Sequence, residues 1–461
     1  MIGDLLKRLL AIVALALLLV PPLPLRAPLP AQAPGELRAG RGSLRAEGGR
    51  IVLHLAGTPY EMGYQQGALL GPQIRWLLGH AVYPSLLEKG LDGPWLIQAT
   101  RLAAEQWPAP LWEEARGIAD SAGVAPADIV LLNLWPDLLL GGAGWKQLDD
   151  NWRRSRRVNR TLADRPGLLV PAEVRLQRGL PALAPGPWPT SGQAGRRPGS
   201  GFWLAAWNDA TADRRPLLAG LLEAYPAGPH PLLVERRPER GLASLGVALP
   251  GWVGLMAGLN EAQVAVLATM APTRDRQLAG VPVPLLVRVA LERSRESEQA
   301  LRRLVRSPRV GGAQVLIASG AGGEREGAEG AVGVELSARL FRVLEPEPTE
   351  TWLMTTPLPL SPELAELAGP RTAPWQEAQR VALDRVAAWL RLNRGFIDQE
   401  KSLALLTEMG GVSGETWVAL VAQPSEGRLW IAQPAGTMPA PAAGFTSLEL
   451  TADTSKPGPP D

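Results

Sequence analysis

The spacing of apolar residues in the first part of the chain is typical of helices. Over residues 59–78 apolar side chains recur every three or four positions, which predicts a helix with one buried face. Thr58 is suited to cap this helix, and Glu61 three residues later completes a capping box. Gly63 and Gly67 lie on one face, where glycine weakens a helix. We therefore expect another element to pack very close to these two glycines.

The pattern changes from helical to strand-like after residue 200. Residues 95–140 continue as amphipathic helices, and periodicity is lost over 141–199. Strands are predicted at 51–55, 202–207, 217–222, 232–235, 243–248, 264–269, 314–319, 332–336, 340–344 and 352–355, helices at 284–293, 297–306 and 375–392, and a hairpin at 416–423 and 428–433. This order predicts an α+β fold with antiparallel sheets and helices packed outside them.

The N-terminus has the three parts of a secretory signal. Lys7 and Arg8 precede an apolar run over 9–20, and Ala31-Gln32-Ala33 offers a small-x-small cleavage pattern. The alternative is an uncleaved anchor, but the run is short for a span, which needs about 20 apolar residues. We expect a signal peptide at 1–33, export to the periplasm, cell surface or medium, and membrane contact only through this segment.

The expected organisation is a single domain over residues 51–450. It comprises a mostly helical part at 51–140, a linker or insertion at 141–199 and a sheet-rich part at 200–450. A flexible Gly/Arg-rich lead-in is expected at 34–50 and a disordered tail at 451–461.

The amino-acid composition excludes several kinds of catalytic and binding chemistry. The 461 residues include no cysteine, which excludes thiol nucleophiles, thiolate ligands and iron–sulfur clusters. The three histidines, His54, His80 and His230, are not at metal-site spacing. A net charge of +2 gives no argument for nucleic acid. We expect no metal, no cofactor and no nucleic-acid partner.

Several segments, in order, resemble one family. They are 57–67 (Gly-Thr-Pro-Tyr-Glu-Met-Gly-Tyr-Gln-Gln-Gly), 114–124 with Leu132-Asn133, Ala205-Ala206-Trp207, 249–254 with 258–261, 281–284 with Arg288, 307–312 and the closing hairpin. They are similar to the acyl-coenzyme A:6-aminopenicillanic acid acyltransferase-like group, also called peptidase family C45, within the N-terminal-nucleophile (Ntn) hydrolases. The resemblance covers about 51–450. It implies a four-layer αββα sandwich and amide hydrolysis or acyl transfer after self-cleavage, with a small acyl-amide or peptide-like ligand.

The resemblance places a nucleophile at the start of the strand over 202–207. In the family this residue is a Cys that follows Gly, and its free α-amine acts as general base. Counting back from Ala205-Ala206-Trp207 places Gly201 at that position, with Ser200 before it. Gly201 has no attacking atom. Ser200, preceded by Gly199, is the nearest candidate, although a shift by one residue turns a strand residue to the other face.

The family's helper positions are also substituted. Leu222 and Ala224 replace an Asn and an Asp, which leaves Glu223 as the nearby carboxylate. Thr356, in Thr355-Thr356-Pro357, replaces the oxyanion-binding Asn of a Thr-Asn-His sequence. Asn260 is retained in a Gly-Leu-Asn-Glu turn, where it serves either the oxyanion or the turn itself.

Three hypotheses follow from these substitutions. The first is an exported, catalytically silent homologue that keeps a binding role. The second is an active amidohydrolase or acyltransferase that uses Ser200, with Thr356, Asn260 and Glu223 as helpers. The third is a structural envelope protein.

Overall fold

The computed structural model describes residues 36–47, 50–141, 145, 201–223, 231–320, 330–369, 373–413, 416–433 and 440–451. The expected signal peptide at 1–33, most of the expected linker at 141–199 and all but residue 451 of the expected tail at 451–461 lie outside these ranges. Within them, no single helix is long and apolar enough to cross a membrane, and the one helix pair that passes on length and composition is bent by 116°.

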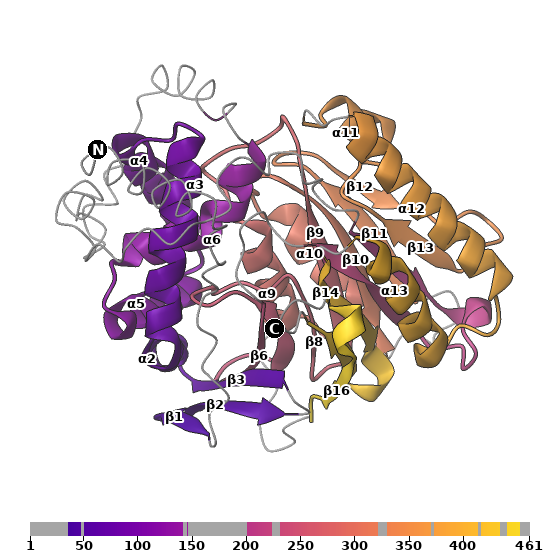
Figure 1. Cartoon of the computed structure of the whole chain (residues 1–461), viewed down its shortest axis with the longest axis horizontal. Helices are drawn as coiled ribbons and strands as arrows, with labels where there is room; N and C mark the ends of the chain where they lie inside the picture. The colour runs from indigo at the N-terminus through magenta and orange to yellow at the C-terminus, as the bar shows by residue number, and fades with distance from the viewer. Residues whose placement is uncertain are drawn as a thin grey trace, which may run out of the picture.

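Two sheets form the centre of the molecule (Figure 1). The larger has the order β1-β2-β3-β6-β7-β8-β9-β10-β11-β12 and the smaller has the order β13-β4-β5-β14-β15-β16. All neighbouring strands are antiparallel except β3 and β6. The strands of the larger sheet are β1 (Leu37–Ala39), β2 (Gly42–Glu47), β3 (Arg50–Gly57), β6 (Leu232–Pro238), β7 (Ser244–Ala248), β8 (Ala257–Asn260), β9 (Val264–Ala271), β10 (Gly312–Ser319), β11 (Ala331–Leu336) and β12 (Phe341–Leu344). Those of the smaller sheet are β4 (Phe202–Ala206), β5 (Leu217–Glu223), β13 (Trp352–Thr355), β14 (Thr416–Gln423), β15 (Arg428–Ala432) and β16 (Thr446–Glu449).

Helices cover the outer face of each sheet. On the larger sheet lie α2 (Pro59–Leu77), α6 (Pro126–Gly141), α9 (Val283–Arg293) and α10 (Ser297–Arg306), with η1 (Leu78–Val82), α3 (Tyr83–Glu88), α4 (Gly93–Glu105) and α5 (Ala109–Ala122) packed among them. On the smaller sheet lie α12 (Ala373–Leu392) and α13 (Gln399–Ser413), and the short α11 (Pro362–Glu366) precedes them. Because β4, β5 and β13 contact β9 and β10, the two sheets face each other. The predicted α+β, four-layer αββα sandwich is confirmed.

The expected close packing on the glycine face of α2 is present. A Cβ atom added to Gly63 would lie 1.9 Å from the carbonyl oxygen of Glu114 on α5, and one added to Gly67 would lie 2.4 Å from that of Ile118. Gly117 of α5 is equally close to the backbone of α2. The predicted capping box of Thr58 and Glu61 also forms and fixes the start of α2. Glycines on both helices therefore let the two backbones touch.

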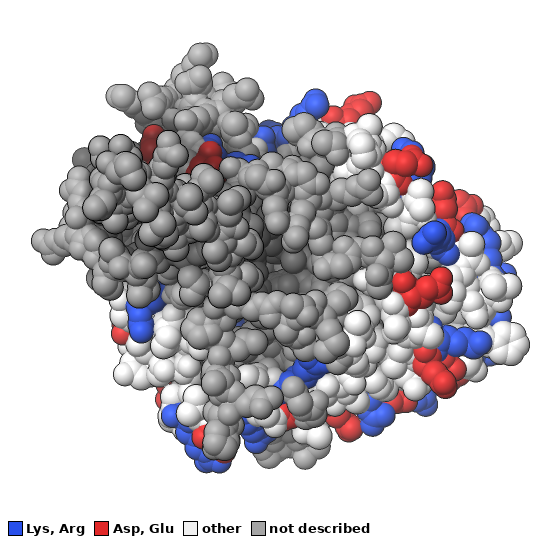
Figure 2. Space-filling model, viewed as in Figure 1, with Lys and Arg blue, Asp and Glu red and all other residues white. Residues whose placement is uncertain are grey.

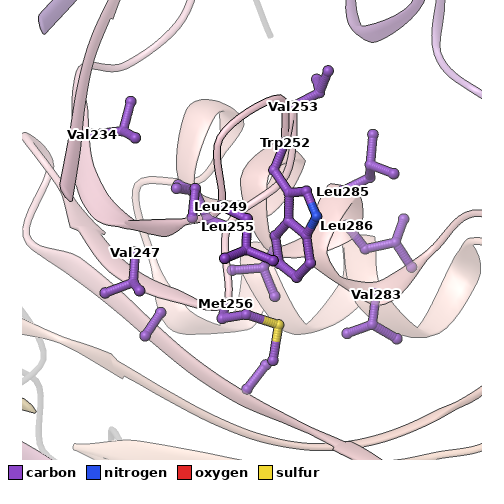
Figure 3. Close-up of a cluster of buried hydrophobic side chains, with 14 of the residues drawn as sticks. Val234, Val247, Leu249, Trp252, Val253, Leu255, Met256, Val283, Leu285 and Leu286 are labelled. Carbon is purple, nitrogen blue, oxygen red and sulfur yellow. The ribbon is translucent and has the colours of Figure 1, made fainter. Parts of the chain in front are cut away.

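Trp252 anchors the loop before β8 in the core between the larger sheet and its helices. Figure 3 shows its indole ring among buried aliphatic side chains of this loop and α9. Its Nε1 donates to the carbonyl of Leu132, and Asn133 Nδ2 donates to the carbonyl of Gly251. Asn133 Oδ1 accepts from the backbone N–H of Val253 at 2.9 Å. The Leu132-Asn133 pair of the resemblance thus joins α6 to the loop.

A buried ion network ties three elements together behind the larger sheet. Glu114 of α5 pairs with Arg288 of α9 at 3.2 Å and with Arg236 of β6 at 3.4 Å. Arg288 also pairs with Glu292 at 3.1 Å. Burial, and then the neighbouring charge of Arg288, lowers the pKa of Arg236 to about 10. Since these side chains are almost fully buried, each depends on the others for its charge balance.

The described surface carries mixed charge. In Figure 2 the basic and acidic side chains of the described residues are interspersed over the region of α11 and α12. Surface ion pairs of the described residues include Arg342–Glu363, Arg391–Glu350 and Arg394–Asp209.

The structure differs from the sequence expectation at the N-terminal edge. Within the expected lead-in at 34–50, β1 and β2 form a hairpin that joins β3, with Leu44 buried. The polar composition of this segment did not indicate strands, because the outer positions of β1 and β2 face water. The short strands β8 and β16 and the helices α11 and α13 were also not predicted.

Candidate functional site

The residues of β4 alternate between the two faces of the smaller sheet. Trp203 and Ala205 point into the core shared with the larger sheet, whereas Phe202, Leu204 and Ala206 point into the core beneath α12 and α13. Gly201 precedes β4 and is buried. By the two-residue period of a strand, position 201 belongs to the face between the sheets.

The neighbour of Gly201 on this face is apolar. Phe202 pairs with Leu221 and Trp203 with Gly220, so continuing the register places Leu222 opposite Gly201. Leu222 is buried in the same core as Trp203. The two inward positions at this end of β4 and β5 therefore bring neither a nucleophile nor a carboxylate.

Thr356 lies at the same end of the smaller sheet. Thr355 pairs with Trp203 across β13 and β4, and Thr356 is the next residue. Its buried hydroxyl accepts from the backbone N–H of Leu358 at 3.2 Å, and the hydroxyl hydrogen remains available as a donor. Glu335 of β11 fixes the following turn by accepting from the N–H groups of Leu360 and Ser361 at 2.5 and 2.7 Å.

Asn260 does not join this group. Its Nδ2 donates to the carbonyls of Leu291 and Ser294, both at 2.7 Å, and its Oδ1 accepts from the N–H of Val264. Leu358, by contrast, accepts from Gln314, which pairs with Thr269 at the other end of β9. Val264 and Thr269 are roughly 16 Å apart along that strand. The hydrogen bonds of Asn260 thus serve the β8–β9 turn and the end of α9.

The two remaining predicted residues are only partly placed. Glu223 ends β5, and its backbone pairs with Thr416. It is therefore at the same end of the sheet as Gly201. Ser200 lies outside the described residues, as does His230.

Sequence reasoning missed several buried polar groups at this end. Gln314 Nε2 donates to Glu335 Oε1 at 2.9 Å. Among the described residues, Gln314 Oε1, Thr355 Oγ1 and Trp203 Nε1 are buried without a hydrogen-bond partner. Glu335, the carboxylate of this group, is fully buried, and the other residues of β11 are apolar or glycine. A single carboxylate in the predicted apolar strand at 332–336 was the available signal.

Comparison with known proteins adds a family match. The family described as acyl-coenzyme A:6-aminopenicillanic acid acyl-transferase matches residues 230–329. The family resemblance is confirmed. This acyl-transferase match spans β6 to β10, including the Trp252 loop and α9.

A curated relative and several solved structures are also similar. An uncharacterized protein of Archaeoglobus fulgidus is 28% identical over 319 residues, which are 64% of this chain and 45% of the relative. The chain therefore spans less than half of that relative's length. The solved structures include an N-acylethanolamine-hydrolyzing acid amidase ortholog of Caenorhabditis elegans (12% identity, 49% of this chain and 93% of that chain, TM-score 0.34). They also include a mutant of the conjugated bile acid hydrolase of Clostridium perfringens (13%, 54% and 92%, TM-score 0.34) and a penicillin V acylase of Agrobacterium tumefaciens (12%, 51% and 83%, TM-score 0.30). At such low identity and TM-score, these similarities imply nothing about this chain's own substrate.

Proposed function

We propose that this protein is an exported, catalytically silent member of the acyl-transferase family that binds an acyl-amide or peptide-like ligand. The observation that carries the proposal is the pair of inward positions at the start of β4 and the end of β5. Gly201 brings no attacking atom, and Leu222 brings no polar atom. At the oxyanion position, Thr356 offers one hydroxyl in place of the family's Asn, and losing such a donor alone costs about 3–4 kcal/mol of transition-state stabilisation.

The unpartnered polar atoms between the sheets support the binding role. Gln314 Oε1 and Thr355 Oγ1 can accept hydrogen bonds, and Trp203 Nε1 and the Thr355 hydroxyl can donate them. An amide group has both a donor and an acceptor, so it complements this set. Buried polar groups are ordinarily hydrogen-bonded, and a ligand amide would satisfy them.

The experiment is to purify the exported protein and determine its intact mass and N-termini. We expect one chain that begins near Ala33 or Pro34, consistent with signal cleavage. We also expect no hydrolysis of N-octanoyl-p-nitroanilide and saturable binding of N-octanoylglycinamide by calorimetry. The signal segment 1–33 is tested by the same N-terminal determination.

The outcomes distinguish the silent binding protein from the active enzyme and from the structural envelope protein. Two chains with a new start at Ser200, together with turnover that Ser200→Ala abolishes, would establish the active enzyme and reject the silent one. A single chain that binds none of the acyl-amide probe would favour the structural envelope protein. Thr355→Val should weaken binding several-fold, whereas Thr407→Val on the exposed face of α13 should not.

A further inference from the structure

A small cavity with several polar side chains in its lining lies outside the space between the sheets. It is partly open and is bounded by the C-terminal end of α6, Trp145, the loop after β9 and the start of β10. The side chains and backbone that line it are those of Asp137, Leu140, Gly141, Trp145, Ala271, Thr273, Arg276, Gly311 and Gly312. Its free volume of about 10 Å³ accommodates one water-sized group.

Three polar atoms from the lining residues are buried and have no hydrogen-bond partner within the described part of the chain. They are Asp137 Oδ2, Trp145 Nε1 and Arg276 Nε. The side chain of Asp137 is only 4% exposed and that of Trp145 only 1%. Leaving such groups unpaired is costly, so three in one cavity indicate that a water or a ligand group pairs with them.

The surroundings hold these three side chains in place. A Cβ atom on Gly311 would lie 2.7 Å from Asp137 Oδ1, and one on Gly141 would lie 1.9 Å from Trp145 Nε1. The absence of a side chain at both glycines therefore makes room for the polar groups. Arg276 Nη1 donates to the carbonyl of Gly141 at 2.8 Å, and its guanidinium lies 5.2 Å from the centre of the Trp145 ring.

The neighbouring Asp275 fixes the loop that presents Arg276. Its carboxylate accepts from Ser337 Oγ at 2.6 Å and from the backbone N–H and Nε of Arg339 at 3.0 and 2.6 Å. Burial alone would raise the pKa of Asp275, but these hydrogen bonds hold the pKa below its ordinary value. Asp275 is thus an anion already paired within the loop.

The charge of the cavity points to an anion. Burial raises the pKa of Asp137 to about 8, so its carboxyl is mostly protonated at neutral pH and can donate. Trp145 Nε1 donates only, and Arg276 donates and is cationic. No carboxylate pairs with Arg276 among the residues that the structure describes. The cavity then offers three donors and one positive charge.

We propose that Asp137, Trp145 and Arg276 form a binding site for one carboxylate group, seated with an oxygen between them. A carboxylate oxygen accepts several hydrogen bonds and carries the negative charge that complements the cation of Arg276. The proposal is independent of whether the protein is catalytic, because none of these residues lies on β4, β5 or β13.

Other ionisable groups around Asp137 must be considered for the pH dependence. On the elements packed against α6 and on the segments beside the cavity they are His80, Tyr83, Glu88, Arg101, Glu105, Glu113, Glu114, Arg116, Asp120, Arg274, Asp275 and Arg309. None of these lines the cavity. The pH dependence of carboxylate binding above neutrality is therefore expected to follow Asp137.

The test compares hexanoate with hexanamide, which have the same shape but differ in charge, by calorimetry on the full chain. We expect hexanoate to bind more tightly at pH 7. Its affinity should fall about tenfold between pH 7 and pH 9 as Asp137 ionises. Asp137→Asn, which stays neutral, should remove this dependence. Arg276→Gln should weaken binding at least about tenfold, whereas the exposed Arg385→Gln should have no effect.

Several results would overturn the proposal. They are equal binding of hexanoate and hexanamide, no hexanoate binding at pH 7, or an unchanged affinity in a folded Arg276→Gln protein. N-acetyldiglycine presents a peptide C-terminus instead of a free acyl acid. If the binding of both hexanoate and N-acetyldiglycine responds to Arg276→Gln and Asp137→Asn, the tighter of the two shows whether the site takes a free acyl acid or a peptide C-terminus. Far-UV circular dichroism of each variant establishes that it is folded.

Discussion

At the scale of single residues, Asp137 links stability to pH. Its pKa rises from 3.8 to about 8 on folding, so the native state holds a proton that the unfolded state releases above its lower pKa. The stabilising contribution of Asp137 is fully present below about pH 4 and is lost as the pH rises towards 8. The contribution falls by up to about 1.4 kcal/mol per pH unit across this window. We expect urea unfolding of Asp137→Asn to lack this slope and to give the more stable protein at pH 8.

Asp384→Asn, an exposed carboxyl on α12, is the matched control and should leave the slope unchanged. An identical pH profile for the wild type and Asp137→Asn would show that Asp137 is ionised in the native state.

Some site residues could be placed from the sequence and others could not. Gly201 could be placed because Ala205-Ala206-Trp207 fixed the register of its strand, and the structure leaves it at the start of β4. Asn260 was a candidate because of its amide, but its partners on α9 are about 30 residues away and invisible to local pattern. Asp137 was missed because Gly311 and Arg276, which surround it, are brought to it only by folding. An acid beyond the first turn of a helix that is apolar on all sides was the local signal.

At the scale of elements, the α2–α5 crossing depends on absent side chains. Gly63→Ala adds a methyl group that would lie 1.9 Å from a backbone oxygen of α5. The gain in helix propensity, about 1 kcal/mol, is smaller than the cost of forcing the helices apart. Since overpacking costs about 1–3 kcal/mol, we expect thermal unfolding to give a net loss of up to about 2 kcal/mol.

Ala68→Gly, at an exposed position of the same helix, measures the propensity difference alone. If Gly63→Ala were as stable as the wild type or more so, the two helices could not be in backbone contact.

The buried network of Glu114, Arg236 and Arg288 depends on one shared carboxylate. Glu114→Gln leaves two buried guanidinium groups without their shared carboxylate. Removing one member of a buried ion pair costs about 3–5 kcal/mol, which chemical denaturation can measure. The exposed Glu298→Gln, which breaks a surface pair with Arg302, should cost less than about 1 kcal/mol. Similar losses in the two variants would mean that water reaches the network.

At the scale of the whole molecule, sequence pattern was sufficient for the layers but not for the sheet edges. The predicted strands and helices after residue 200 fall on β4 to β15 because central strands are continuously apolar and helices show a 3.6-residue period. β1 and β2 were not predicted because β1 is an exposed edge strand and β2, which lies between β1 and β3, has charged side chains at its exposed end. The pairing of β3 with β6, across the segment 58–231, is a long-range contact that no local pattern encodes.

Self-cleavage of the kind that the family resemblance implies needs groups from several elements at once. Combining Ser200→Gly with Gly201→Cys restores the Gly-Cys pair that the family resemblance places before β4. The new thiol would share the face of Trp203, but Leu222 on β5 and the Thr356-Pro357 turn after β13 would still lack the family's polar groups. We therefore expect the double variant to remain one chain by intact mass after prolonged incubation. Release of a chain that begins at residue 201 would mean that the nucleophile was the only missing part, and that the surrounding sandwich still supports self-cleavage.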